Sequence, residues 1–134
     1  MLRRQVLNLL LTKKVMATPQ RLDVGEVLFA KRQHLSAEQI LDALHAHGKS
    51  VSKATVYNTL GLFVERGLLN TVHVDPTRVV YDTTCEPHHH IFNVATGELT
   101  DVAFGELDVR ELPPLPPGTV VDGVEVLIRV RPTA

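Results

Sequence analysis

Three consecutive histidines, His88, His89 and His90, have the residue type and spacing that most clearly predict chemistry in this chain. They lie at the start of a short apolar run that we expect to form a strand. A strand would place His88 and His90 on one face and His89 on the other. Because neutral imidazole is a common protein ligand of borderline metals, the pair on one face could supply half of a metal site. A solvated histidine cluster without a ligand is the alternative interpretation.

The composition indicates a small protein with an aliphatic core. Its 134 residues correspond to one domain, or to two small domains that share an interface. Hydrophobic residues make up 44% of the chain, whereas aromatic residues make up only 4%. Because Cys85 is the single cysteine, one chain can form neither an internal disulfide nor a cysteine-based zinc clamp. With no signal-peptide pattern and no apolar run long enough to span a bilayer, we expect a soluble cytoplasmic protein without a membrane partner.

The net charge of -1 conceals an asymmetry along the chain. Residues 1–82 contain 11 Lys and Arg against 7 Asp and Glu, whereas residues 83–134 contain 3 against 8. A basic first part and an acidic second part predict a module that binds a polyanion, joined to a module with another role.

Apolar residues at helical spacing predict four helices in the first part, over residues 2–15, 18–32, 36–48 and 52–67. Thr18, followed by Pro19, has the pattern of an N-cap. Ser36 and Gln39 form a capping box, and Ser52 caps the fourth helix. We therefore expect the helix starts to be well defined.

After Gly67 the periodicity changes to that of short strands, over residues 69–74, 78–82, 90–94, 98–102 and 120–130. The last of these is the longest β-branched run and the strongest strand prediction. Residues 112–118 contain four prolines and should form an extended connector. Helices two to four followed by a hairpin predict a winged helix-turn-helix, in which the last helix enters the DNA major groove. A small α+β domain with no nucleic-acid role is the alternative.

Several motifs in their order along the chain resemble those of the ferric uptake regulator (Fur) family: Thr18-Pro19-Gln20-Arg21, His34-Leu35-Ser36-Ala37-Glu38, Ser52-Lys-Ala-Thr-Val-Tyr-Asn-Thr-Leu60, Val80-Tyr81-Asp82 and Gly97-Glu98-Leu99. The part after Asp82 looks most similar to the iron response regulator branch. The resemblance implies an α+β protein with a winged-helix DNA-binding domain over residues 1–82, a hinge over 83–87 and an α/β dimerisation and metal-binding domain over 88–134. It also implies a homodimeric, iron- or haem-responsive regulator, not an enzyme, that binds palindromic promoter DNA.

The resemblance also assigns residues to sites. The regulatory metal site would use His34, Asp82, His88, His90 and Asp101, a nitrogen and oxygen set that suits Fe, Mn or Zn. A possible second metal or haem site would combine His89 with Glu106 or Asp108. DNA contacts would come from Lys13, Lys14, Arg21, Lys53, Thr55, Tyr57 and Asn58.

Some family features are missing. Asn93 and Thr96 occupy the positions of the first cysteine pair of the family's zinc clamp. Cys85 is followed by Glu86 instead of proline, so the Cys-Pro haem motif of some iron response regulators is absent. The family's long dimerisation helix should be cut short, because residues 104–112 run into prolines.

Two other functions fit the same residues. The first is a peroxide sensor, in which aspartates such as Asp82 and Asp101 hold Fe(II) beside histidines, and peroxide oxidises a ligand such as His34 or His88. The second, more remote, is a small metalloenzyme that activates water. Against the enzyme, the cluster has no clear general base beside it, and a filled coordination sphere would leave no position for substrate.

Overall fold

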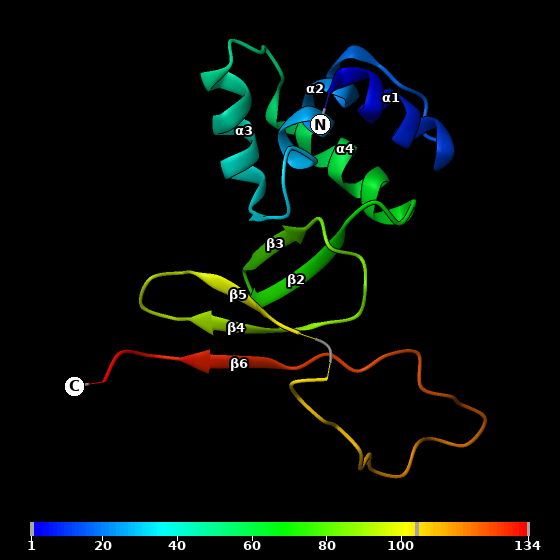
Figure 1. The fold of residues 1–134 in the computed structure, drawn as a ribbon, viewed down its shortest axis with the longest axis vertical. Helices are drawn as coiled ribbons and strands as arrows, with labels where there is room; N and C mark the ends of the chain where they lie inside the picture. The colour runs from blue at the N-terminus through cyan, green and yellow to red at the C-terminus, as the bar shows by residue number, and fades with distance from the viewer. Residues whose placement is uncertain (1, 104, 134) are drawn as a thin grey trace. The chain divides into compact units, whose positions relative to one another are not determined.

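The computed structural model describes residues 2–103 and 105–133 of a mixed α+β protein (Figure 1). Two compact units divide the chain, the first extending to Cys85 and the second beginning at Glu86. None of the helices in the described part of the chain is long and apolar enough to cross a membrane.

The first unit begins with four helices: α1 (Arg3–Thr12), α2 (Pro19–Leu28), α3 (Ala37–Ala46) and α4 (Lys53–Glu65). The predicted caps are present. Thr18 Oγ1 accepts a hydrogen bond from Arg21 N at 3.2 Å, and Ser52 Oγ accepts one from Thr55 N at 3.2 Å. In the capping box, Ser36 Oγ accepts from Gln39 N at 3.1 Å while Gln39 Oε1 accepts from Ser36 N at 2.9 Å. These bonds satisfy backbone N–H groups that have no partner within the helix.

Two helices end at least three residues before their predicted ends, and the other two end two residues before theirs. Helix α1 ends at Thr12, because Lys14 adopts a left-handed conformation with φ of 59°. The prediction that the second helix continues to Arg32 is wrong, since α2 ends at Leu28. There the carbonyls of Val27 and Leu28 accept hydrogen bonds from a side chain instead of from a further helical turn.

Aliphatic side chains from all four helices form the core of the first unit. Its fully buried members include Val6, Leu10, Val24, Leu28, Ile40, Leu44, Leu60 and Phe63. Burying each such side chain contributes roughly 1.5–3 kcal/mol relative to leaving it in water. Helices α1 and α2 approach closely at Gly25, where a Cβ atom would overlap Val6 Cγ1. The helices are therefore held together by dense packing.

A three-stranded antiparallel sheet completes the first unit, with the order β1 (His34–Leu35), β3 (Arg78–Asp82) and β2 (Asn70–Asp75). Strands β2 and β3 form the predicted hairpin. Its turn is fixed by Asp75, which accepts hydrogen bonds from Thr77 N at 2.9 Å and from Arg78 Nε at 2.5 Å. Strand β1 was not predicted, because two residues are too few to show a strand period. It pairs with β3 so that His34 lies opposite Asp82.

The second unit contains a three-stranded sheet with the order β5 (Leu99–Val102), β4 (His89–Asn93) and β6 (Leu127–Val130). Strand β4 pairs antiparallel with β5, as predicted, and parallel with β6.

The prediction of one long strand over residues 120–130 is wrong, because only Leu127–Val130 forms a strand. Asp122 and Gly123, both poor strand formers, interrupt the β-branched run, and Val120 is 89% exposed. The shortened helix expected over residues 104–112 is also not observed in residues 105–112, which form a turn and irregular chain; Phe104 lies outside the described residues. The connector over residues 112–118 is irregular and exposed, as predicted.

Candidate metal centre

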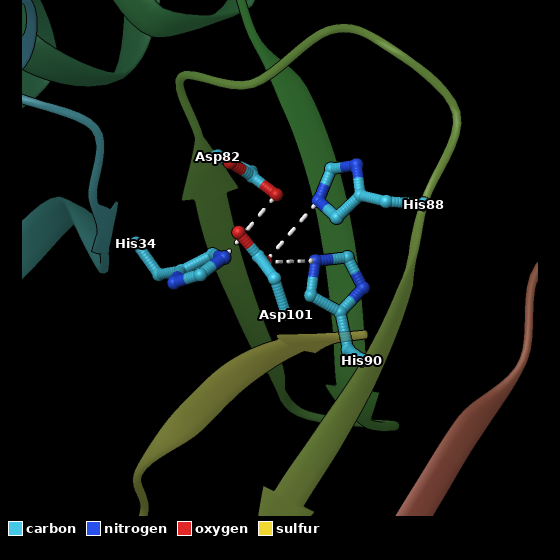
Figure 2. Close-up of side chains that lie close together, drawn as sticks. All are labelled: His34, Asp82, His88, His90 and Asp101. Atoms are coloured by element: carbon cyan, nitrogen blue, oxygen red, sulfur yellow. Dashed lines mark ion pairs between the residues drawn. The ribbon is translucent and has the colours of Figure 1, made fainter. Parts of the chain in front are cut away.

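In the first unit, His34 and Asp82 form a pair of candidate metal ligands (Figure 2). They are direct partners across β1 and β3, and His34 Nε2 lies 3.3 Å from Asp82 Oδ2. The Asp82 side chain is only 1% exposed, and its Oδ1 accepts a hydrogen bond from Thr84 N at 2.9 Å. That hydrogen bond fixes the carboxylate orientation, so Oδ2 faces the imidazole. Backbone pairing therefore prearranges one nitrogen and one oxygen ligand atom.

In the second unit, His88 and His90 both contact Asp101 (Figure 2). Their Nε2 atoms lie 3.3 Å and 3.4 Å from Asp101 Oδ1, and the two rings lie edge to face with centroids 4.4 Å apart. His90 is the direct partner of Asp101 across β4 and β5. The predicted sharing of one face by His88 and His90 is thus observed.

The environment of His88 determines which of its nitrogens can bind a metal. Its Nδ1 lies 2.6 Å from the carbonyl oxygen of Glu86, which can only accept a hydrogen bond. Nδ1 therefore carries the hydrogen, and in the neutral ring the lone pair lies on Nε2, the atom that faces Asp101 Oδ1 at 3.3 Å. A backbone carbonyl that orients a histidine in this way is typical of metal sites.

The donor chemistry of both sets fits a first-row divalent metal. His34, Asp82, His88, His90 and Asp101 each offer one ligand atom, three imidazole nitrogens and two carboxylate oxygens in all. Such a mixed set suits Mn, Fe or Zn. The first unit offers two of these ligands and the second offers three, and both numbers are below the four to six that these metals take. Each set alone would therefore need water molecules or further ligands to complete the coordination of an ion.

The residues of the possible second site are not brought together. His89 is 7% exposed, and its Nδ1 accepts a hydrogen bond from Val126 N at 3.1 Å. Glu106 and Asp108 are exposed, and Asp108 pairs with Arg110. Within the described residues, no group of three or more potential ligand atoms includes any of these three side chains. The second site stays a prediction.

Of the candidate DNA-binding residues, Lys53, Tyr57 and Asn58 lie on the exposed side of α4. Tyr57 is 45% exposed. Thr55 is half-buried and accepts a hydrogen bond from the Ser52 hydroxyl at 2.9 Å. Its side chain therefore takes part in capping the start of α4. The exposed side of α4 offers a cation, an aromatic ring and an amide.

The remaining candidates flank the link between α1 and α2. Lys13 and Lys14 are exposed, and the Lys14 carbonyl accepts a hydrogen bond from Arg66 Nη1 at 2.9 Å. Arg21 donates to the carbonyl oxygen of Met16 at 2.8 Å, which holds its guanidinium against the link. These three residues stay predicted contacts.

Polar residues beside the ligands were not predicted to have a role. Gln33, Thr83 and Thr84 form hydrogen bonds around His34 and Asp82. The role of Thr84 could have been predicted from the sequence. An Asp side chain often accepts a hydrogen bond from the backbone N–H two residues later, in an Asx turn. Thr84 N donates to Asp82 in this way. Nothing in the sequence marks Gln33, because its contacts depend on where α2 ends.

Comparison with known proteins identifies the family. The family model of the ferric uptake regulator family matches residues 12–113. The peroxide-responsive repressor PerR of Staphylococcus saprophyticus is 29% identical over 97 residues, which cover 72% of this chain and 66% of that protein, just under two thirds. Among solved structures, the ferric uptake regulator of Pseudomonas aeruginosa with manganese has a TM-score of 0.74 and 27% identity, covering 95% of this chain and 97% of that chain. PerR from Streptococcus pyogenes has a TM-score of 0.52 and 25% identity, covering 74% and 68%.

The family model extends over α2, α3 and α4 and over both candidate ligand sets, in agreement with the motif resemblance. They do not distinguish the iron response regulator branch, which stays a prediction. The chain belongs to the ferric uptake regulator family.

Proposed function

We propose that the protein is a cytoplasmic, dimeric transcription regulator that binds promoter DNA and responds to a divalent metal ion. The first unit would be the winged-helix DNA-binding domain, with α4 in the major groove and the β2–β3 hairpin as the wing. The second unit would provide dimerisation. Family membership supports this assignment, as do the polar side chains exposed on α4.

The observation that carries the proposal is the division of ligands between the two units. His34 and Asp82 in the first unit and His88, His90 and Asp101 in the second would together hold one ion. Because each set is incomplete alone, binding favours arrangements in which both sets reach the same ion. The ion would then select the orientation of the DNA-binding units in the dimer, and with it their fit to two half-sites.

Iron is the proposed physiological metal, by the motif resemblance to iron response regulators. The Pseudomonas aeruginosa relative was solved with manganese, whose preference for nitrogen and oxygen ligands is similar. Zinc binds more tightly than either at most such sites, so affinity alone does not identify the metal in the cell. A haem response is a further proposal, and it would have to use a ligand other than the missing Cys-Pro motif.

Binding to promoter DNA with each ion supplied separately tests the proposal. Fluorescence anisotropy of labelled palindromic, A·T-rich promoter DNA should show an affinity that changes when Mn(II), Fe(II) or Zn(II) is added. Haem forms a separate arm. Affinity should also fall steeply with salt, because Lys and Arg neutralise phosphates and release counterions. No preference for any such site, with or without metal, would exclude the proposal.

Peroxide sensing is the second candidate, favoured by the two aspartates, Asp82 and Asp101, and by the likeness to peroxide-responsive repressors. In that function, one oxygen atom of hydrogen peroxide is added to a ligand histidine such as His34 or His88, and the other leaves as water, with Fe(II) required at the site. Intact-mass spectra should then show one added oxygen atom per chain in the Fe(II) form and none in the Mn(II) form. An unchanged mass in both forms would rule out this candidate.

A further inference from the structure

Gln33, which is not among the proposed ligands, connects the ligand-bearing strands of the first unit to the end of α2. Its side-chain Nε2 donates hydrogen bonds to the carbonyl oxygens of Val27 and Leu28, both at 2.8 Å. These carbonyls belong to the last turn of the helix, where the carbonyl groups lack partners within the helix. We propose that Gln33 is a positioning residue that transmits ion occupancy at His34 and Asp82 to the helices of the first unit. The inference rests on the proposed function.

The backbone of Gln33 holds both ligands in place. Gln33 N donates to Thr83 Oγ1 at 3.2 Å, and Thr83 N donates to the Gln33 carbonyl oxygen at 3.3 Å. Gln33 directly precedes His34, and Thr83 directly follows Asp82. The hydrogen-bonded pair Gln33 and Thr83 thus lies directly beside the pair His34 and Asp82. A displacement of either ligand should therefore displace Gln33 as well.

Thr84 provides a parallel connection on the other side of Asp82. It is 7% exposed, and its N–H holds Asp82 Oδ1 at 2.9 Å. Its hydroxyl oxygen accepts a hydrogen bond from Arg32 Nε at 3.2 Å, and its carbonyl oxygen accepts one from Asn70 Nδ2 at 3.2 Å. Arg32 directly precedes Gln33. These two neighbouring residues are therefore hydrogen-bonded to Thr84 and Thr83, the two residues that follow Asp82.

The helix that Gln33 caps is packed too densely to absorb a shift at its end. Leu28 and Val24 are fully buried in the core that α2 shares with α3 and α4. Interiors of this density transmit displacements rather than absorbing them. A change in the position of Gln33 should therefore reach α4, which carries the proposed DNA contacts Lys53, Tyr57 and Asn58.

A purely structural cap would have the same hydrogen bonds, so the test must separate coupling from stability. In the full chain, Gln33→Met keeps side-chain length but removes the donor, whereas Gln33→Lys keeps a donor that suits the carbonyl end of a helix. Gln39→Met is the matched control: it removes the Gln39 bond to Ser36 N, at 2.9 Å, which caps α3 two residues after His34, and it leaves the bonds of Gln33 to α2 and to Thr83 in place. The quantity measured is the ratio of DNA affinities at saturating Mn(II) and without metal.

We expect Gln33→Met to reduce this ratio about twofold to thirtyfold, the range for residues that modulate coupling without touching either ligand. Mn(II) affinity in the absence of DNA should stay close to that of the unsubstituted protein. Gln33→Lys should restore most of the ratio, and Gln39→Met should leave it unchanged although it lowers thermal stability. In the unsubstituted protein, Mn(II) should slow amide hydrogen exchange in the peptide covering residues 25–33.

The outcomes are distinguishable. If the unsubstituted protein shows no Mn(II)-dependent change in DNA affinity, the proposed function fails and the inference with it. If that protein responds and Gln33→Met responds equally, or Gln39→Met reduces the ratio as much, the positioning role is refuted while the proposed function stands. Should Gln33→Met fail to fold, unchanged exchange in residues 25–33 of the unsubstituted protein would still refute the inference.

Discussion

Replacing His34 with alanine removes one of the two ligands that the first unit would contribute to the ion. The other is Asp82, which keeps its hydrogen bond from Thr84 N. The His34 side chain is 16% exposed and makes its ion pair with Asp82 at 3.3 Å, so the substitution removes a nearly buried imidazole but no core side chain. The fold of the first unit should survive, because its core consists of hydrophobic side chains, most of them on α1–α4, and does not include His34.

The expected magnitude follows from the number of ligands. Four of five ligands remain in His34→Ala, and we set the loss of metal affinity at about 1–3 kcal/mol by analogy with the tenfold to hundredfold effects of disturbed metal shells. Binding at a coupled site typically changes the affinity of the other site by about 1–3 kcal/mol. In His34→Ala, the effect of metal on DNA affinity should fall by a larger fraction than the metal affinity does, because one of the two ligands that the first unit contributes is lost. In the double variant His34→Ala with Asp82→Asn it should disappear, although His88, His90 and Asp101 still bind metal weakly.

Anisotropy of labelled promoter DNA with and without Mn(II), together with calorimetric titration of Mn(II), measures both quantities. His73→Ala is the control, because His73 is an exposed imidazole on β2 of the same unit, opposite Val79 and outside the ligand set. If His34→Ala kept the full metal-dependent change in DNA affinity, the shared site would be wrong. If His34→Ala lost Mn(II) binding altogether, the expectation that the four remaining ligands still bind the ion would be wrong.

Two further predictions concern stability. Gly25→Ala should lower the free energy of unfolding by about 1–3 kcal/mol in urea titration, because the added Cβ would overlap Val6 Cγ1, whereas Gly61→Ala, in open space on α4, should raise it by about 0.5–1 kcal/mol. A hydrogen bond from Arg78 lowers the pKa of Asp75 from 3.8 to about 2, with smaller effects from the turn. The charged carboxylate therefore stabilises the hairpin above pH 3.8, and this contribution should be lost as the pH falls through about 2; an NMR titration of the Asp75 carboxyl with a midpoint near 3.8 would contradict it.

Secondary structure was predictable where side chains act on their own backbone. The caps at Thr18, Ser36 and Ser52 need only residues three positions away, so the starts of α2, α3 and α4 follow from the sequence. Helix ends and strand lengths depend on more distant contacts. The run over residues 120–130 has strong β propensity, yet only Leu127–Val130 finds a ladder partner, in β4. Propensity cannot supply a neighbouring strand, which is why that prediction failed.

The candidate ligands were predictable from residue type and family motifs, whereas the residues that position them were not. The two-residue spacing of His88 and His90 predicts a shared face by strand periodicity, and both side chains contact Asp101 although β4 begins only at His89. Gln33 acquires a role only because α2 ends at Leu28 and leaves carbonyls within reach of its amide. That end point arises from packing and loop geometry and leaves no local pattern in the sequence.

In both units, antiparallel strand pairing places a candidate histidine ligand opposite a candidate aspartate ligand. His34 lies directly opposite Asp82 in one sheet, and His90 lies directly opposite Asp101 in the other. Direct cross-strand partners have Cβ atoms about 4.5–5.5 Å apart, a separation that the short aspartate side chain and an imidazole can bridge without strain. A register shift by one residue would move one partner to the opposite face of its sheet and so separate the two side chains. The geometry within each candidate ligand set is therefore fixed by backbone pairing. Under the proposed function, the ion would only have to bring together two sets that are already formed.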